Sequence, residues 1–274
     1  MLRNTTDLEG YVIGATDGTI GHVKDFYFDD RAWVIRYLVV DTGAWLSSRS
    51  VLISPFAIGH PDWAERILPV SITKEKVKNS PDIDTKKPVS RQQESQYLEY
   101  YGYPYYWVGA GVWGQGAYPS MILPGFGTAV QGPQVQAGYV GADAESGRRR
   151  NNDPHLRSCK EVVKYQIHAT DGDIGHVQAM LVDEESWAIR YLIVDTSNWW
   201  LGHQVLIAPQ WIKDVSWADA KVSVNVTRLA VKGSPPYDSA ARLDRNQEVG
   251  IYKHYRRTGY WADEVIRESA TSRR

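Results

Sequence analysis

Residues 15–23 read Ala-Thr-Asp-Gly-Thr-Ile-Gly-His-Val, and residues 169–177 read Ala-Thr-Asp-Gly-Asp-Ile-Gly-His-Val. A second shared stretch starts at Trp33 and Trp187, and both copies continue with Ile-Arg-Tyr-Leu and end in Val-Asp-Thr. The offset between shared positions is 154 residues throughout, because residue 2 matches residue 156 and residue 107 matches residue 261. A repeat this long indicates two whole domains instead of a solenoid of small units. We therefore predict an internal duplication.

Within each copy the pattern is that of short strands. Asp17-Gly18 and Asp171-Gly172 separate apolar runs, which predicts a two-residue hairpin turn. The run from 34 to 40 is almost continuously apolar and predicts a strand buried on both faces. A strand at 51–53 is expected to end before the proline that follows it, and the same holds for 205–207.

Helices are expected only near the end of each copy. Thr73 and Thr227 are suited to cap a short helix. Ser90 and Asp244 each stand three residues before a glutamine, which predicts a capping box at the start of a second helix. The predicted fold class is therefore all-β with short C-terminal helices, as two small antiparallel barrels.

The segment between the copies has its own composition. Residues 100–142 hold no charged residue but contain ten glycines and four prolines. Such a sequence suits a flexible linker, and its prolines and glycines disfavour a membrane-spanning helix. An interfacial or partner-docking segment is the alternative. The expected boundaries are domain 1 at 1–107, the linker at 108–154, domain 2 at 155–261 and a tail at 262–274.

Charge and cysteine content narrow the functional classes. The chain has 31 Lys and Arg against 32 Asp and Glu, a net charge of −1, and so lacks the basic excess of a dedicated nucleic-acid binder. Cys159 is the single cysteine, so neither an intrachain disulfide nor a multi-cysteine metal site is possible, and a cytoplasmic location is expected. The first residues lack the apolar run of a secretory signal.

The sequence also lacks the motifs of common enzymes. It has no nucleophile elbow, no phosphate loop and no HExxH motif. Residues 109–114 match the glycine spacing of a dinucleotide-binding fingerprint. That fingerprint also requires an acid about twenty residues later, and the next acid here, Asp143, lies too far along the chain. We therefore predict no enzymatic activity, no cofactor and no metal.

Arg36 and Arg190 are the most informative charged residues. A guanidinium inside an apolar strand needs a partner or must lie where the strand meets solvent. The first interpretation is a salt bridge to a strand-end acid, and the second is an interface or anion site. The candidate acids are Asp29 and Asp41 in the first copy, and Asp183 and Asp195 in the second.

Aromatic residues offer a similar choice. Trp45 in one loop, and Trp199 and Trp200 in the matching loop, either close the end of a barrel or act as exposed anchors for a partner. The tyrosine-rich segment 97–107 contains no Lys or Arg, so we expect it to pack against the barrel instead of stacking on bases.

His22 and His176 recur together with Asp41 and Asp195. One histidine in a domain supplies at most one zinc ligand, so a structural or surface role is expected. A shared site at a pseudo-twofold axis is the alternative. Each aspartate ends a strand just before a threonine, which suits side-chain bonding to a turn.

Taken together, these motifs resemble the PRC-barrel family. The resemblance rests on the Asp-Gly-x-Ile-Gly-His-Val string, Asp29 and Trp33, the Ile-Arg-Tyr-Leu-Val-Val-Asp-Thr strand, the Val-Leu-Ile-x-Pro strand and the aromatic tail at 101–107. It implies a strongly bent antiparallel barrel in each half without catalytic activity. The family takes its name from the photosynthetic reaction-centre H subunit, whose barrel packs on membrane-embedded partners, and a related barrel occurs in ribosome-maturation factors.

Two functions follow as expectations. The first is a bacterial scaffold or adaptor that docks on protein partners, in the cytoplasm or peripheral to the inner membrane, with its two barrels packed as an intrachain pseudo-dimer. The alternative is a ribosome- or RNA-associated factor. Its basic residues would be limited to a few clusters: residues 148–150, Arg157, the 256–257 pair and the C-terminal arginines.

Overall fold

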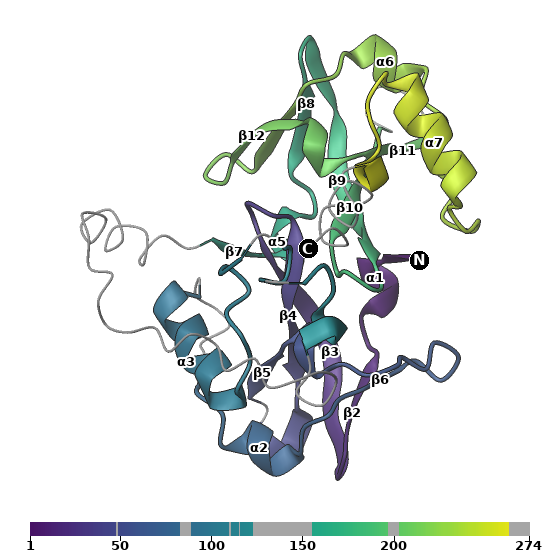
Figure 1. Cartoon of the computed structure of the whole chain (residues 1–274). Coiled ribbons are helices and arrows are strands. Elements are labelled where there is room, and N and C mark those ends of the chain that lie inside the picture. Colours follow the sequence, from purple (N-terminus) through teal and green to yellow (C-terminus); the bar gives the residue numbers. More distant parts are fainter. Residues whose placement is uncertain are drawn as a thin grey trace, which may run out of the picture. The chain divides into compact units, whose positions relative to one another are not determined.

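A computed structural model describes residues 1–47, 49–82, 89–109, 111–114, 116–122, 155–196 and 203–262. The chain forms two compact units. Unit 1 contains Met1 and residues 3–161 and 182–189, and unit 2 contains Leu2 and residues 162–181 and 190–274. Figure 1 labels the elements of both along the chain. This division differs from the expected boundary at residue 155, because 155–161 and 182–189 belong to unit 1.

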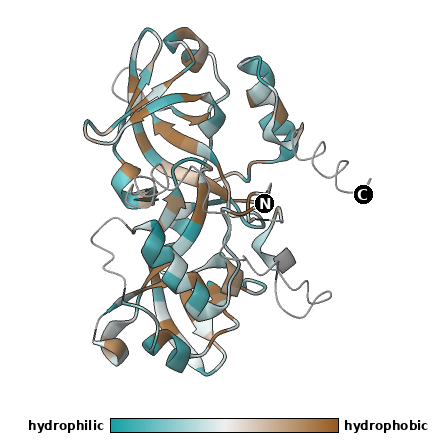
Figure 2. Ribbon diagram, turned by 60° about the vertical axis from the view of Figure 1, so that its left-hand side comes forward, coloured by the Kyte–Doolittle hydropathy of each residue, from teal (hydrophilic) through white to brown (hydrophobic). Residues whose placement is uncertain are grey.

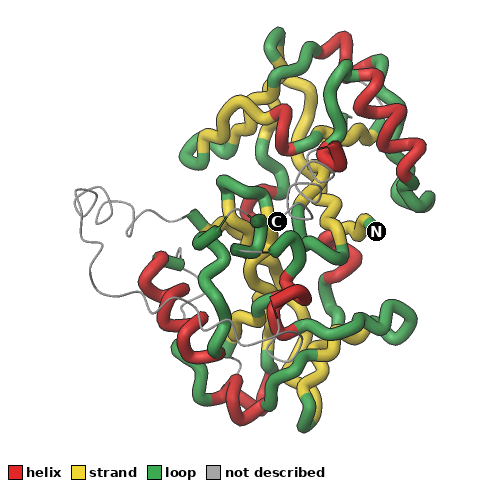
Figure 3. The backbone as a smooth tube through the Cα atoms, viewed as in Figure 1, coloured by secondary structure: helices red, strands yellow, loops and turns green. Residues whose placement is uncertain are grey.

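The sheet of unit 1 follows the order β5-β4-β3-β2-β6, and β7 pairs with β3. All of these pairings are antiparallel except that of β2 with β6. The strands, yellow in Figure 3, are β2 (Val12–Ala15), β3 (Gly18–Asp29), β4 (Val34–Asp41), β5 (Ser50–Ile53), β6 (Ile67–Pro69) and β7 (Leu156–Ser158). Strand β3 is the longest and pairs with three neighbours, so it organises the sheet.

The hairpin between β2 and β3 lies one residue earlier than predicted. Ala15 pairs with Gly18, so the two connecting residues are Thr16 and Asp17. Gly18 has a φ of +132°, whereas Asp17 is not among the residues with positive φ. The glycine is needed because it starts the strand in a conformation that other residues rarely adopt. The turn was therefore predicted at the right place with the wrong register.

Gly21 permits close approach of two strands. A Cβ atom at this position would lie 2.0 Å from the carbonyl oxygen of Asp41, far inside van der Waals contact. Gly175 is in the same situation, 1.9 Å from the carbonyl oxygen of Asp195. The glycine before each histidine is thus required by packing.

Short helices flank the sheet of unit 1. These are α1 (Thr5–Leu8), α2 (Lys74–Lys78) and α3 (Arg91–Tyr101), with 3-10 turns at Gly43–Leu46, Pro55–Ala57 and Pro119–Ile122. The Ser90 hydroxyl accepts from Gln93 N, and the Gln93 side chain accepts from Ser90 N, so the predicted capping box is confirmed. Helix α3 buries Tyr97 and Leu98 among the strands. The N-terminal strand β1 (Leu2–Asn4) precedes α1.

Unit 2 is built around the order β11-β10-β9-β8-β13-β12. Its strands are β8 (Gln166–Ala169), β9 (Gly172–Asp183), β10 (Ile189–Asp195), β11 (Gln204–Ile207), β12 (Ile212–Ser216) and β13 (Lys221–Val224). Its helices are α6 (Arg228–Lys232) and α7 (Arg245–His254), with a 3-10 turn at Pro209–Trp211. Helix α5 (Cys159–Val162) lies mostly in unit 1. Asp244 and Gln247 form the second capping box, also as predicted.

The chain is thus mostly β, with two separate sheets and short helices. Figure 2 shows the apolar residues gathered on the strands. Over the residues that the structure describes, helices are too short or too polar to cross a bilayer.

The first part of the expected linker is packed into unit 1. Trp113 is 0% exposed, and its indole Nε1 donates to the carbonyl of Ser186 at 2.7 Å. Residues 111 and 114 form a β-bridge, as do 113 and 116. A flexible linker starting at residue 108 is therefore wrong for this stretch, because a tryptophan fills a core position there. Residues 123–154 lie outside the described part of the chain.

Candidate functional site

A buried carboxylate on helix α3 is the centre of the most polar cluster in unit 1. The capping box starts the helix at Ser90, so that Glu94 falls on its inner face, where the side chain is 0% exposed. Arg91, one turn earlier, places its Nη1 3.2 Å from Glu94 Oε2. The helix thus brings its own cation to the buried acid.

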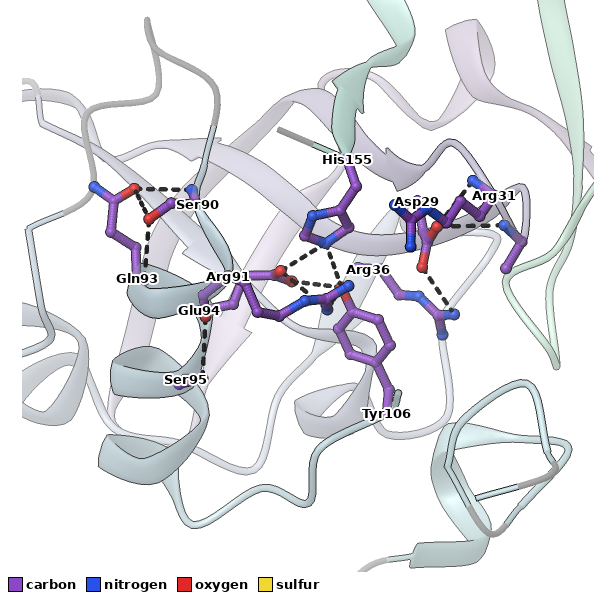
Figure 4. Close-up of polar contacts among 11 residues, drawn as sticks. Asp29, Arg31, Arg36, Ser90, Arg91, Gln93, Glu94, Ser95, Tyr106 and His155 are labelled. Atoms are coloured by element: carbon purple, nitrogen blue, oxygen red, sulfur yellow. Dashed lines mark hydrogen bonds and ion pairs between the residues drawn. The ribbon is translucent and has the colours of Figure 1, made fainter. Parts of the chain in front are cut away.

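Two residues from distant segments complete the contacts of this acid. The Tyr106 hydroxyl donates to Glu94 Oε1 at 2.5 Å, and His155 Nε2 lies 2.7 Å from Glu94 Oε2. The histidine is 4% exposed and also lies 3.2 Å from the Tyr106 hydroxyl. Figure 4 shows the imidazole and the phenol both pointing at the carboxylate. Residues 94, 106 and 155 therefore form one closed polar cluster.

Arg36 lies beside this cluster in the middle of β4. Its Nη1 donates to the carbonyl of Val112 at 2.7 Å, and its Nη2 is 3.7 Å from Asp29 Oδ2. The guanidinium carbon stands 3.9 Å from the centre of the Tyr106 ring and 4.8 Å from that of Trp113. Stacking on an aromatic face and pairing with a carboxylate are what a buried guanidinium requires. Of the two acids considered for Arg36, Asp29 is the partner, and Asp41 is exposed at the far end of the strand.

Burial is the main cause of the pKa shifts of Arg36 and Tyr106. It lowers the pKa of the Arg36 guanidinium, which the neighbouring charges partly offset. It raises the pKa of Tyr106 well above the usual value for a phenol, and the charge of Glu94 adds to that rise. Tyr106 is therefore a neutral donor at physiological pH, in keeping with its bond to the carboxylate.

Unit 2 holds a corresponding cluster on helix α7. Glu248 is buried, and its Oε1 accepts from Tyr260 at 2.8 Å and from Tyr191 at 3.0 Å. Arg245 Nη1 lies 3.1 Å from Glu248 Oε2, and the Arg190 guanidinium stacks on Tyr260 at 4.0 Å. Each unit thus ties a helix that starts with a capping box, α3 or α7, and the aromatic tail after it to the arginine of its central strand.

Such an arrangement favours structure over chemistry. The carboxylate, the phenol and the guanidinium hold one another within hydrogen-bonding or stacking distance, and none of them faces open solvent. A buried ionic group that is fully paired stabilises one arrangement of the chain, and removal of one partner is costly. The cluster therefore fastens helix α3, the aromatic tail and His155 onto β4.

Trp45 is held to its own sheet. Its Nε1 donates to the carbonyl of Ile20 at 2.5 Å, and Lys74 Nζ lies 4.6 Å from its ring centre, so the side chain is half-buried. It neither fills the core nor stands free as an anchor. Trp199 and Trp200 lie outside the described residues. In the tyrosine-rich segment, Tyr97, Tyr101 and Tyr106 are buried, in agreement with packing against the sheet.

The repeated histidines lie near the surface. His22 is exposed, and His176 is half-buried with its Nε2 4.0 Å from Asp195 Oδ2. Asp41 Oδ1 accepts from the backbone N–H of Gly43 at 2.9 Å, which is the turn role expected of it. Among the described residues no group of three His, Cys, Asp or Glu is arranged to hold a metal ion.

The turn aspartates have a further role that the sequence did not indicate. Asp17 Oδ1 accepts from the backbone N–H of Lys74 at 2.7 Å, and Asp171 Oδ1 accepts from Arg228 N at the same distance. Each carboxylate therefore meets the first turn of the short helix α2 or α6, where negative charge is favourable. The hairpin tip is anchored to a helix more than fifty residues away in the chain.

A polar cluster of Glu94, Tyr106 and His155 was not predicted from the sequence. A signal was present, because Arg91, Glu94 and Tyr106 recur as Arg245, Glu248 and Tyr260 at the same offset of 154. A glutamate that is present in both copies on the inner face of a predicted helix indicates a buried carboxylate with an ion-pair partner. His155 gave no such signal, since the matching position is Met1.

Comparison with known proteins finds a match to a domain family in one part of the chain. The model of the PRC-barrel domain family matches residues 5–76, which include β2 to β6 of unit 1. A search of curated proteins found no match. Residues 5–76 of this chain therefore correspond to a PRC-barrel domain.

Proposed function

We propose that this chain is a non-enzymatic scaffold or adaptor that carries two PRC-type barrel modules and docks on protein partners through their surfaces. In this proposal the modules arose by internal duplication. The chain acts in the cytoplasm, at or near the inner membrane, as its resemblance to the reaction-centre H subunit implies.

The duplication has support from the element bounds. Adding 154 to the limits of β2, β3, β5 and α2 yields the limits of β8, β9, β11 and α6. The helical cluster of Glu94 likewise has its counterpart at Glu248. Two unrelated sequences seldom agree in the bounds of four elements at one offset, so a shared origin is the simplest account.

The observation that carries the docking role is a difference between the two copies. Leu229 on α6 is 79% exposed, and Val249 on α7 is 44% exposed. At the matching positions, the first copy has Glu75 and Ser95. Isolated surface leucines are common. Here, however, polar residues of the first copy are replaced by exposed apolar residues on both helices of the second copy, and this indicates a surface that a partner covers.

The two helices are joined to each other, which supports treating them as one surface. His254 Nε2 at the end of α7 lies 2.7 Å from the carbonyl oxygen of Ala230 on α6. We therefore treat α6 and α7 as one docking face, defined by Leu229 and Val249. A partner of matching chemistry presents an apolar patch with a polar rim.

Site-specific photo-crosslinking in the source cell tests this proposal. A photoreactive amino acid at position 229 is expected to yield a discrete protein adduct that survives nuclease, and Val249→Glu is expected to reduce its yield. The matched control places the same amino acid at Lys232, an exposed position on the same helix. Adducts that consist of RNA would support the ribosome-associated alternative, and equal labelling from positions 229 and 232 would overturn the docking face.

A further inference from the structure

Unit 1 takes one of its strands from the far side of the expected linker. Strand β7 lies antiparallel to the end of β3, with Tyr27 opposite Ser158 and Asp29 opposite Leu156. The backbone N–H of Asp30 also donates to the carbonyl of His155 at 2.9 Å. Leu156 and Cys159 are buried. The segment 155–160, which we call the donor strand, is thus an integral part of the sheet.

Four carboxylates of unit 1 meet the donor strand along its length. Glu94 meets His155 at 2.7 Å, and Asp30 Oδ2 accepts from Arg157 Nε at 3.0 Å. Farther along, Asp25 accepts from the Ser158 hydroxyl at 2.5 Å and from the backbone N–H of Lys160 at 3.2 Å. Glu9 Oε2 lies 2.8 Å from Lys160 Nζ. We call these four acids and residues 27–29 the acceptor edge.

The acceptor edge is therefore selective for this strand in charge as well as shape. A basic residue of the donor strand stands opposite an acid at three of its positions: 155, 157 and 160. Backbone pairing supplies affinity to an added strand, and side-chain complementarity supplies its register. A segment with the same sequence would satisfy every one of these contacts, whichever chain supplied it.

The first residues of the chain form an ion pair that corresponds to one of these pairs. Here the first copy supplies the arginine and the second copy supplies the acid. Arg3 Nε donates to Glu184 Oε2 at 3.0 Å, and both residues belong to unit 1. At the offset of 154, Arg3 matches Arg157, and Glu184 matches Asp30. The opening strand of each copy thus carries an arginine that pairs with an acid of the other copy, which is the contact pattern of exchanged strands.

We propose that the donor strand is exchangeable, and that the acceptor edge binds the same segment of a second copy of this chain to give a strand-exchanged homodimer. Exchange of an identical element is a low-cost route to a dimer, because each contact made in the monomer is made again. The inference does not depend on the docking face of α6 and α7.

Complementary charge reversal tests the exchange in the full chain. Asp30→Arg sets two guanidinium groups against each other at this pair, and Arg157→Asp sets two carboxylates against each other, so each variant alone has a mismatched strand. In a strand-exchanged heterodimer the edge with Asp30→Arg receives the strand with Arg157→Asp, and the unchanged Asp30 of the other chain receives an unchanged Arg157, so both junctions regain an opposite-charge pair. Each homodimer keeps a like-charge pair at both of its junctions, so the mixed pair is compared with the homodimers.

The measurement uses mass-tagged chains. The two variants are unfolded together, refolded at about 0.5 mM and examined by native mass spectrometry. The high protein concentration lets the strand of a second chain compete with the strand of the same chain, because a linked segment has an effective concentration on the order of millimolar. The expected result is a heterodimer at least about tenfold more abundant than either homodimer, because it removes the like-charge pair at both junctions and a tenfold preference corresponds to only about 1.4 kcal/mol.

The matched control is the double variant Asp30→Arg/Arg157→Asp. Its restored opposite-charge pair, within one chain or between two identical chains, should return it to the dimer level of the wild type. Folded single variants that remain monomers when mixed, or that dimerise without preference for the mixed pair, would overturn the proposal.

A second pair of charge-reversal variants is used if the reversal at position 30 prevents folding. Glu9 and Lys160 are more exposed, at 32% and 46%, so reversal of either is better tolerated. Glu9→Lys and Lys160→Glu are mixed and measured in the same way. Preference for their heterodimer supports exchange, and its absence counts against it.

Discussion

Arg36 and Tyr106, far apart in the chain, are in contact, with the guanidinium carbon over the phenol ring and 3.9 Å from its centre. Tyr106 in turn donates to Glu94. The central strand, the aromatic tail and helix α3 are therefore held by one continuous set of contacts, which ends at the buried carboxylate of Glu94.

Glu94→Ala should destabilise unit 1 by about 3–5 kcal/mol, because it leaves the buried Tyr106 and His155, and the half-buried Arg91, without their acceptor. Glu94→Gln keeps an acceptor and should cost less. Urea unfolding followed by tyrosine and tryptophan fluorescence measures the change. Gln96→Ala, an exposed position on the same helix, is the control and should differ from wild type by less than about 0.5 kcal/mol. Equal stabilities for the alanine variants at 94 and 96 would contradict the structural role.

Two glycines of unit 2 should respond in opposite directions to the same substitution. Gly175→Ala would bring a Cβ atom 1.9 Å from the Asp195 carbonyl, at a φ of +137°, so a large loss of stability is expected. Gly250 lies in helix α7 with open space around its Cα, so Gly250→Ala should stabilise by about 0.5–1 kcal/mol. Thermal unfolding by circular dichroism compares them. A neutral Gly175→Ala would mean that β9 does not approach β10 as closely as described.

Trp113→Ala should lower the stability of unit 1 by about 3–5 kcal/mol, since a fully buried indole and its bond to Ser186 are lost. The substitution should also speed proteolysis between residues 105 and 122. Trp107→Ala, at a half-buried position earlier in the same segment, is the comparison and should have the smaller effect. If Trp113→Ala behaves like wild type in both assays, residues 111–114 belong to the linker after all.

Asp25 should make the protein less stable as the pH rises out of the acid range. Burial raises its pKa above the usual 3.8, although bonds from Ser158, Phe26 and Lys160 oppose the rise. The folded state then holds the proton more tightly than the unfolded state, so the free energy of unfolding falls as pH increases from 3.8 through the raised value. Asp25→Asn removes this dependence.

The pH experiment compares the wild type and Asp25→Asn at about pH 3.5 and about pH 7 by urea unfolding. The difference in stability should shift in favour of Asp25→Asn at the higher pH. The control is Asp62→Asn, because Asp62 is a surface residue that caps its own loop. A shift in the opposite direction would mean that the three hydrogen bonds outweigh burial.

Much of the local structure could be predicted from the sequence. Strands at 34–41 and 50–53, and the capping boxes at Ser90 and Asp244, follow from hydrophobic pattern and cap chemistry, which act over a few residues. The register of the first hairpin was missed by one residue, because Asp-Gly can start a strand as well as form a turn. Local signals do not distinguish these two uses.

The candidate site was only half predictable. Arg36 was recognised because a charge interrupts an apolar run, and an acid such as Asp29 was a reasonable partner. Glu94 and His155 meet from distant parts of the sequence, and no local periodicity encodes a contact of that range. Trp113 was assigned to the linker for a similar reason, since glycines surround it and the strand that it covers lies far away in the chain.

The position of the donor strand has a consequence for biosynthesis. When the ribosome has added residue 122, the end of β3 still lacks its neighbour, and 38 further residues must be made before residue 160 is reached. At about 5–20 residues per second, that interval is about 2–8 s. During it the nascent polypeptide presents an open backbone edge beside four acids, and the basic residues that meet three of them are not yet translated. This negative charge discourages premature pairing with other chains.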